Sequence, residues 1–379
     1  FDDRISKFQV SIEVGFVALD VRTGEIKAMV GGRNQDFKYG LNHVTQIRRQ
    51  PGSAFKPIVY SVALNSGLYP AYPILNQPFD YRGWSPNNFD HSVGGFVTLR
   101  EALRESLNLV SARLIIEDHV QLWKVGRVAS DLGIKSKLDL VPSISLGAAE
   151  VTPLELTNVY ATLANEGIYN EPIAITKIED NDGILIDAFY SDSREAIDEE
   201  TAFMMTNMMQ TVIDEGTGRR IRSIHNFHRP AAGKTGTTQD YGDAWFVGFT
   251  PQIAAGVWIG FDDRRVSFTG SYGQGSKAAI PIWANFMREV YEKKDLPLED
   301  FNMPPSGDIV NADFCKETIF ELGDPKLYSR DCPSEKYTDL IKVNDIPDSY
   351  DPERDTEIKI FEKYMVKDSV SNEAVEIID

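Results

Sequence analysis

Two groups of strand patterns lie at opposite ends of the first 294 residues, and they constrain the fold more than any other feature of the sequence. In residues 14–31, apolar residues recur at every second position from Val14 to Ala18, and the alternation resumes at Ile26 after a turn. Three further patterns follow at 231–238, 243–249 and 253–261. The alternation in residues 14–31 predicts a β-hairpin, and we expect strands at the three later segments as well. A sheet assembled from distant segments, with helices between them, is an α+β fold.

The segments between these strands carry helical signals. Thr98-Leu-Arg-Glu101 is a capping-box pattern, which predicts a helix beginning at Thr98. Another helix is expected to begin at Pro153 and to end at Asn165-Glu166-Gly167, where the glycine can serve as a C-cap. The remaining expectations are helical segments at 53–66, 109–132, 199–215 and 281–293, a hairpin at 173–189 and a structured loop at 72–95.

The distribution of charge divides the chain into parts. The formal net charge of −18 argues against nucleic-acid binding, because phosphates would be repelled. Residues 295–379 hold 22 acidic and 9 basic residues, so this last fifth is far more acidic than the rest. We therefore predict a linker remnant at 1–12, a main domain at 13–294 and an acidic C-terminal extension at 295–379.

The extension loses the regular apolar patterns of the main domain. Its charge and irregularity predict that it is peripheral to any catalysis and that truncation after Lys294 leaves activity within a few-fold. It holds both cysteines of the chain, Cys315 and Cys332. Two cysteines are too few for a disulfide framework, and no cysteine or histidine cluster indicates a metal. One disulfide between them is possible in an oxidising compartment.

Ser53-Ala54-Phe55-Lys56 is the first of three motifs that carry chemistry. Positions i and i+3 share one face of a helix, so the hydroxyl of Ser53 and the amine of Lys56 can meet. A serine becomes a strong nucleophile only when a base takes its proton. Lysine is such a base only when neutral, and roughly one unperturbed lysine in a few thousand is neutral at pH 7. Burial and a second nearby cation would both favour the neutral form.

The other two motifs lie downstream. Ser106-Leu107-Asn108 follows the helix expected from Thr98, and it offers a hydroxyl that can relay a proton and an amide that can orient a lysine or a carbonyl. Lys234-Thr235-Gly236-Thr237-Thr238 lies on an expected strand. Its glycine permits close approach of another backbone or a ligand, its threonines can bind a carboxylate, and a strand-edge N–H can complete an oxyanion hole.

Each motif alone is a weak signal, whereas the three in this order form a specific set. Ser-x-x-Lys, Ser-x-Asn and Lys-Thr-Gly together are typical of penicillin-binding proteins and class A β-lactamases. Over about residues 10–290 the chain resembles the transpeptidase domain of class A, bifunctional penicillin-binding proteins. The segments that carry this resemblance, besides the three motifs, are 47–60, Leu19-Asp20 to Gly31-Gly32, Pro86-Asn-Asn-Phe-Asp90, Leu146-Gly147 to Gly167, Gly216-Thr-Gly218 and Asp243-Ala-Trp-Phe-Val-Gly248.

The resemblance implies a fold and a role for each motif residue. The fold would be the one that penicillin-binding proteins share with serine β-lactamases, a mainly antiparallel sheet flanked by helices with a helical subdomain. Ser53 would be acylated by the D-Ala-D-Ala end of a peptidoglycan stem peptide, with Lys56 as its base. The remaining implied roles are proton relay by Ser106 and Lys234, orientation of Lys56 and the peptide by Asn108, an oxyanion hole from the N–H groups of Ser53 and Thr237, and substrate binding by Thr235, Gly236, Thr237 and Thr238.

The resemblance also implies a setting. An amine of a second stem peptide would release the acyl group, and β-lactam antibiotics would acylate Ser53 as substrate mimics. No cofactor or metal is needed. The expected location is the periplasmic or extracellular face of the bacterial cytoplasmic membrane. Family members carry an N-terminal membrane anchor and a glycosyltransferase domain, and neither is present in this sequence.

Proteins with two other functions also carry these motifs. A serine β-lactamase would hydrolyse the acyl-enzyme with a carboxylate base, but the sequence has no Glu-x-x-Leu-Asn segment, and Glu166 falls at an expected helix end. A β-lactam-sensing domain would keep the nucleophile without turning over peptides. The lifetime of the acyl-enzyme separates transpeptidase from β-lactamase, and peptide turnover separates both from a sensor.

Overall fold

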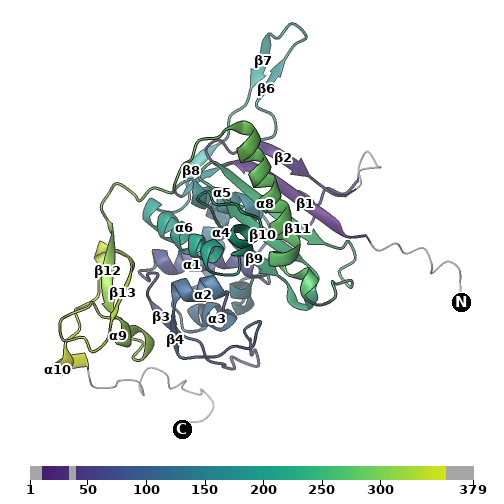
Figure 1. Cartoon of the computed structure of the whole chain (residues 1–379). Helices are drawn as coiled ribbons and strands as arrows, with labels where there is room; N and C mark the ends of the chain where they lie inside the picture. The colour runs from purple at the N-terminus through teal and green to yellow at the C-terminus, as the bar shows by residue number, and fades with distance from the viewer. Residues whose placement is uncertain (1–10, 34–39, 356–379) are drawn as a thin grey trace, which may run out of the picture.

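A computed structural model of the chain describes residues 11–33 and 40–355. Its centre is a five-stranded antiparallel sheet in the order β2-β1-β11-β10-β9, shown in Figure 1. The strands are β1 (Glu13–Asp20), β2 (Ile26–Val30), β9 (Ala232–Thr237), β10 (Ala244–Phe249) and β11 (Ile253–Gly260). The two expected groups of strands therefore meet, because β1 pairs with β11 along its whole length. Strand β9 is left at one edge of the sheet.

Alternation along the strands sends side chains into two separate apolar layers. Helix α8 (Gly275–Lys294) covers one face, where Phe16, Phe246 and Val257 pack with it. Val17, Trp245 and Trp258 point to the other face, which α5 (Pro153–Ala164) covers as part of the larger core. Both faces are thus buried, as the apolar strand sequences require.

The helical region of the main domain agrees with the sequence patterns, except that the segment expected at 109–132 forms two helices separated at 117–121, where Asp118 has a positive φ. Thr98 caps α2 (Leu99–Glu105) through a complete capping box with Glu101, and Thr152 caps α5 in the same way. The other helices of this region are α1 (Lys56–Asn65), α3 (Asn108–Ile116), α4 (Leu122–Asp131), α6 (Glu199–Asp214) and α7 (Arg220–Ser223), with 3₁₀ turns η2 (Gly52–Phe55), η3 (Pro142–Leu146), η4 (Gln239–Tyr241) and η5 (Gly270–Gly273). Within the described ranges, no helix combines the length and apolar character needed to cross a membrane.

Helix α8 and the loop at 72–95 differ in detail from the expectation. The helix begins at Gly275 instead of Pro281, which lies inside it. Its first turn packs against β9 and β10, since a Cβ at Gly275 would lie 2.1 Å from the Trp245 carbonyl oxygen. The expected loop is mainly irregular but contains β3 (Pro73–Leu75), which pairs with β4 (Phe96–Thr98).

The hairpin expected at 173–189 is present and projects away from the body (Figure 1). It consists of β6 (Lys177–Glu179) and β7 (Leu185–Ala188) around the turn at Gly183. A second small pair, β5 (Ile168–Asn170) with β8 (Ser193–Glu195), joins the hairpin to the body.

The expectation of an irregular extension was wrong for residues 309–355. Strands β12 (Ile309–Cys315) and β13 (Lys336–Lys342) form an antiparallel ribbon, accompanied by α9 (Lys316–Phe320), a 3₁₀ turn η6 (Val343–Asp345) and α10 (Pro352–Asp355). Ile309 and Leu340 belong to the main core, and Phe314 stacks on Tyr69 with ring centroids 5.4 Å apart. The ribbon is thus packed onto the main domain. Most of the linker remnant at 1–12 and the end of the extension at 356–379 lie outside the described residues.

Cys315 and Cys332 form a disulfide that closes the loop between β12 and β13. Their sequence separation of 17 residues corresponds to a loop-closure contribution of about 3 kcal/mol. We expect the Cys315→Ser/Cys332→Ser variant to lose about 2–4 kcal/mol of unfolding free energy in denaturant titrations under oxidising conditions. Under reducing conditions the wild type should approach the variant. Equal stability of the two proteins in both conditions would contradict a structural role for the bond.

Candidate active site

Ser53 lies in a tight turn that leads directly into α1. Turn η2 begins at Gly52, which has φ +54° and approaches the end of β9 so closely that a Cβ would lie 2.6 Å from the Thr237 carbonyl oxygen. The turn is held from behind by the Tyr160 hydroxyl, which donates to the Ala54 carbonyl at 2.7 Å, and by the Trp245 indole, which donates to the Gln50 carbonyl at 3.0 Å. Ser53 itself is only partly buried. Its position is therefore fixed while its side chain stays accessible.

Lys56 is fully buried at the first position of α1. Its amine donates to the Ser106 carbonyl at 2.7 Å and to Asn108 Oδ1 at 2.9 Å, and its Nζ lies 3.4 Å from Ser106 Oγ. Burial, and secondarily the charge of Lys234, hold the pKa of Lys56 well below its usual value. This buried environment, with a second cation nearby, favours the neutral form of the lysine that a base requires, and the meeting of its amine with the Ser53 hydroxyl stays a prediction.

Ser106 and Asn108 occupy the sharp connection between α2 and α3. Ser106 caps α2 in the left-handed conformation with φ +63°, which turns the chain so that Asn108 can begin α3. The side-chain oxygen of Asn88 receives the backbone N–H groups of Asn108 and Leu109 at 2.7 and 3.1 Å. Asn108 Nδ2 donates to the Asn87 carbonyl at 2.9 Å, which leaves Oδ1 directed at Lys56.

Lys234 approaches Ser106 from strand β9. Its amine donates to Ser106 Oγ at 2.9 Å, so this hydroxyl lies between two buried lysines. Burial lowers the pKa of Lys234 to about 7, although the carboxylate of Glu105 acts in the opposite direction. Near neutral pH, Lys234 can therefore either give or accept a proton through Ser106.

The free edge of β9 faces the turn that carries Ser53. Within the β9–β10 ladder the Thr238 N–H donates to the Asp243 carbonyl at 3.1 Å. Because backbone groups alternate in an antiparallel ladder, the N–H of the preceding Thr237 points to the outer edge, towards Gly52 and Ser53. Gly236 is required there, since a Cβ would lie 2.1 Å from the Pro51 carbonyl oxygen.

The three threonines of β9 and its end are not equivalent. Thr235 Oγ1 donates to Thr217 Oγ1 at 2.8 Å. Thr237 Oγ1 accepts the Gly275 N–H, the first of helix α8, at 3.1 Å. Thr238 Oγ1 accepts the Asp243 N–H at 2.9 Å and closes the turn into β10. All three hydroxyls therefore have partners within the protein, and substrate binding by these threonines stays a prediction.

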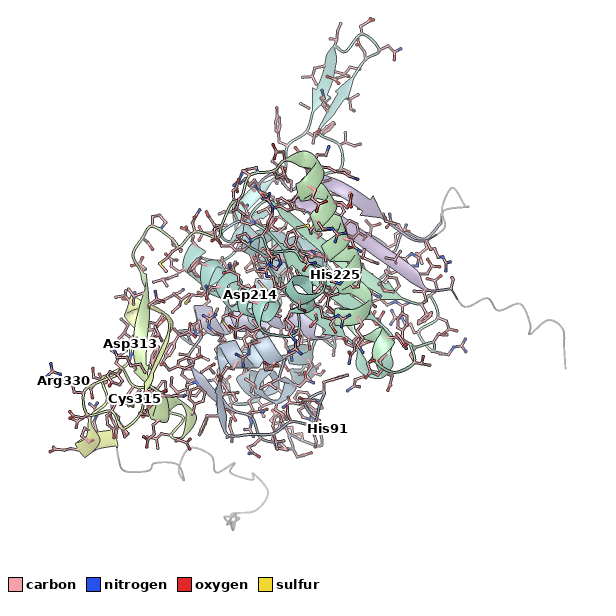
Figure 2. All side chains as sticks on the ribbon, in the orientation of Figure 1. His91, Asp214, His225, Asp313, Cys315 and Arg330 are labelled. Atoms are coloured by element: carbon pink, nitrogen blue, oxygen red, sulfur yellow. A yellow bond between two sulfur atoms is a disulfide. The ribbon has the colours of Figure 1, made fainter. Side chains whose placement is uncertain are left out.

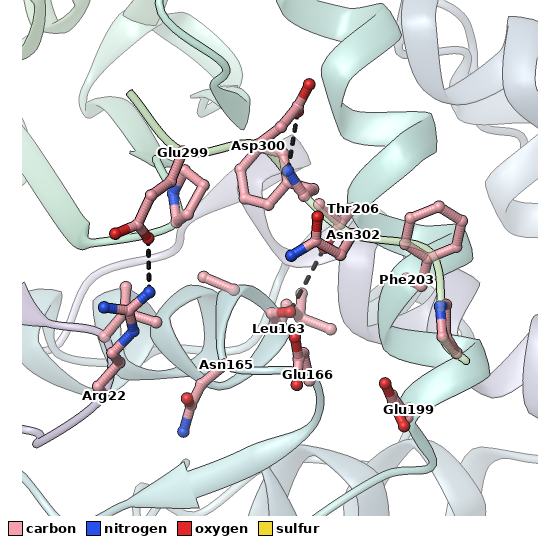
Figure 3. A pocket seen from close by; sticks show the side chains of 15 residues that line it. Arg22, Leu163, Asn165, Glu166, Glu199, Phe203, Thr206, Glu299, Asp300 and Asn302 are labelled. Atoms are coloured by element: carbon pink, nitrogen blue, oxygen red, sulfur yellow. Dashed lines mark hydrogen bonds and ion pairs between the residues drawn. The ribbon is translucent and has the colours of Figure 1, made fainter. Parts of the chain in front are cut away.

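Neither of two surface cavities coincides with this site. One, of about 420 Å³, is lined by Glu166, Glu199 and Asn302, among others, with Arg22 bound to Glu299 at its rim (Figure 3). The other, of about 550 Å³, lies along α4 around Trp123 and Arg194. Glu166 lines the first cavity at the C-terminal end of α5, and none of the motif residues lines either one.

The residues of the three motifs thus converge at the junction of α1, the α2–α3 connection and β9. A half-exposed hydroxyl, a buried amine with a lowered pKa, a shared serine and a strand-edge N–H are the components of acyl transfer through a serine ester. The family model of the penicillin binding protein transpeptidase domain matches residues 14–288. This chain belongs to that family.

Relatives of this penicillin-binding transpeptidase agree with the assignment. Penicillin-binding protein 1A of Aquifex aeolicus is 38% identical over 306 residues, which cover 79% of this chain and 41% of the relative. Penicillin-binding protein 1A of Neisseria lactamica is 36% identical over 306 residues, with 77% and 37% covered. The chain thus spans about two fifths of the length of these curated relatives.

Solved structures confirm the fold expected for a penicillin-binding transpeptidase. Penicillin-binding protein 1A from Haemophilus influenzae superposes with a TM-score of 0.79 at 26% identity, covering 89% of this chain and 54% of that one. The PonA1 protein from Mycobacterium tuberculosis in complex with penicillin V gives a TM-score of 0.68 at 25% identity, with 79% and 83% covered.

Some residues of the site were not assigned from the sequence. Thr217 lies in the Gly216-Thr-Gly218 segment that contributed to the family resemblance, but only the structure shows its hydroxyl beside Thr235. Asn88 lies in another such segment, and its role in fixing the start of α3 follows from its contact with the Asn108 N–H. Glu105, which influences the pKa of Lys234, belongs to no motif.

Proposed function

We propose that the chain is a serine D,D-transpeptidase that joins peptidoglycan stem peptides through an acyl-enzyme at Ser53 and that β-lactams inhibit it covalently. The observation that carries this proposal is the fully buried amine of Lys56, whose pKa is lowered and whose neighbours are Ser106, Asn108 and the charge of Lys234. Family membership supports action on peptidoglycan, and the contacts among Lys56, Ser106 and Lys234 support acyl transfer at Ser53.

In the acylation step the Ser53 hydroxyl attacks the carbonyl of the penultimate D-alanine. Lys56 takes the hydroxyl proton, and the oxygen of the tetrahedral intermediate is held by the N–H groups of Ser53 and Thr237. The bond to the terminal D-alanine then breaks. Its nitrogen leaves with a proton passed through Ser106, which Lys234 contacts at 2.9 Å. The terminal carboxylate would bind to the hydroxyls of Thr235 and Thr237.

In the second step an amine from another stem peptide attacks the ester and restores Ser53. The amine loses a proton to the same set of groups, and the product is a cross-link. A β-lactam would acylate Ser53 in the same way, but its leaving nitrogen stays tethered to the acyl group. Release by water needs an additional base, and Glu166, which lies at the C-terminal end of α5, lines a separate cavity.

We further propose residues 13–294 as the transpeptidase domain, 295–379 as a C-terminal extension and 1–12 as a linker remnant. Because this chain spans about two fifths of relatives named penicillin-binding protein 1A, we infer that a glycosyltransferase domain and a membrane anchor precede it in the whole protein. The disulfide between Cys315 and Cys332 supports a location outside the reducing cytoplasm. We place the domain on the periplasmic or extracellular face of the membrane.

The kinetics of penicillin release test this proposal. We expect a burst of one penicillin bound per chain, followed by an acyl-enzyme that persists for the length of the experiment. Steady hydrolysis at the ~1–10³ per second typical of enzymes would instead identify a β-lactamase. Incubation with a D-Ala-D-Ala peptide and an amine acceptor should yield a cross-linked product, detected by mass spectrometry. A stable acyl-enzyme without any peptide product would identify a sensing domain.

A further inference from the structure

The extension is bound to the start of α2 by polar contacts as well as by apolar packing. Tyr337 of β13 places its hydroxyl 3.3 Å from Oγ1 of Thr98, the N-cap residue of α2. Two positions further along the ribbon, Asp339 binds Arg100 of α2 with both carboxylate oxygens, one of them 2.8 Å from Arg100 Nε. Asp339 is 6% exposed, so this is a buried, two-point ion pair between the extension and the main domain.

Arg100 also binds helix α6, so α6 is connected to the Arg100–Asp339 ion pair. Its Nη1 donates to Thr211 Oγ1 at 2.9 Å and its Nη2 to Asn207 Oδ1 at 2.8 Å. A further bond from Nη1 reaches the Asn207 carbonyl at 3.4 Å, so every N–H group of the guanidinium has an acceptor. The planar fork of arginine fixes three elements, α2, α6 and β13, relative to one another.

Both helices held by Arg100 end at the site. Helix α2 spans only seven residues, and Ser106 is its C-cap. Helix α6 ends at Asp214, labelled in Figure 2, and is followed by Thr217. The Thr217 N–H donates to the Arg104 carbonyl of α2 at 3.3 Å, and its hydroxyl oxygen accepts the Thr235 hydroxyl at 2.8 Å. Ser106 and Thr217, the partner of Thr235, are therefore both held by one α2–α6 unit.

We propose that Asp339 of the C-terminal extension is a positioning residue for acylation, which acts through Arg100 to hold Ser106 and Thr217 in register with Lys56, Lys234 and Thr235. The proposal rests on the proposed function of the Ser53 site. It assigns the extension a part in the reaction, in contrast to the peripheral role that its composition predicts.

The extension could instead contribute only to stability. In that case loss of Asp339 would lower the fraction of folded chains but leave each folded chain as fast as the wild type, with the same pH dependence. A positioning role predicts slower acylation per folded site. It also predicts an altered pH profile, because the Lys234–Ser106 contact would change. The two roles are separated by counting penicillin-binding sites independently of the rate at which they react.

The test compares Asp339→Asn with Asp313→Asn in the full chain. Asn preserves the shape of the side chain and removes the charge that binds Arg100. Asp313 is the matched control, since it lies on the same ribbon but pairs with exposed Lys336 at the surface (Figure 2). Sites are counted by saturation with fluorescent penicillin, and second-order acylation rate constants are measured per site from pH 5 to 9.

We expect Asp339→Asn to acylate at least ~10-fold more slowly per site, with a shifted pH profile, because small displacements of reacting groups are costly. Asp313→Asn should match the wild type, and Asp339→Glu should recover part of the rate. An Asp339→Asn protein with the wild-type rate per site and the wild-type pH profile would overturn the proposal.

If Asp339→Asn yields no folded protein, Asn207→Ala decides, because it removes only the bond from Arg100 Nη2 to α6. A rate per site at least ~5-fold below wild type supports the proposal, and a rate within ~2-fold overturns it. Failure of the proposed function is distinct from either result. It would show in the wild type, which would then take up no penicillin at Ser53.

Discussion

The Ser53→Ala variant should lose covalent labelling by fluorescent penicillin completely. The wild type should gain one label per chain, and the labelled peptide should map to Ser53 by mass spectrometry. The physical reason is that Ser53, which is only partly buried, lies in the turn that packs against the end of β9 and leads directly into Lys56, a buried lysine whose pKa is lowered. Removal of one oxygen atom leaves no other group that can form the ester at this position.

Ser66→Ala is the matched control for this experiment. Ser66 caps the other end of α1 and is exposed, so the same substitution there should leave labelling unchanged. Thermal unfolding of both variants should resemble that of the wild type, because Ser53 is only partly buried. A label that persists in Ser53→Ala, or an adduct on a different residue, would show that the nucleophile has been assigned wrongly.

Local sequence signals account well for the main domain. The capping box at Thr98, the proline at 153 and the alternation in β1 each indicate a local structure through residues that are close in the chain. The three motifs could be assigned to one active site because their order in the chain resembles that in penicillin-binding proteins. Their spacing alone did not show that Ser106 would lie between Lys56 and Lys234, since 50 and 128 residues separate it from them.

Features that depend on contacts between distant residues could not be predicted in this way. The extension is acidic overall, but β12 and β13 alternate so that Ile309 and Leu340 reach the main core, while Asp339 is neutralised by Arg100. A count of charges takes no account of such pairing. Helix α8 begins six residues before Pro281 because its first turn docks on β9 and β10, which local propensity does not register.

Lys56→Arg should slow acylation of Ser53 by at least ~100-fold, the usual contribution of a general base. Arginine retains a positive charge and hydrogen-bond donors, but its guanidinium cannot lose a proton in the accessible pH range. In the wild type, burial holds the pKa of Lys56 well below its usual value, so the neutral base persists to lower pH than in an ordinary lysine and is lost as the pH falls through that lowered value. The variant should therefore acylate slowly at every pH, and its acylation rate should not show the decrease at low pH that protonation of Lys56 causes in the wild type.

Lys137→Arg is the control, because Lys137 is exposed and the same substitution there should change neither quantity. Acylation is measured by stopped-flow with a chromogenic β-lactam, and sites are counted by burst amplitude so that misfolded chains do not contribute. Near-normal rates in Lys56→Arg would mean that another group deprotonates Ser53. Lys234 would then be the group to test, since its pKa of about 7 and its contact with Ser106 place a second lysine within the same proton path.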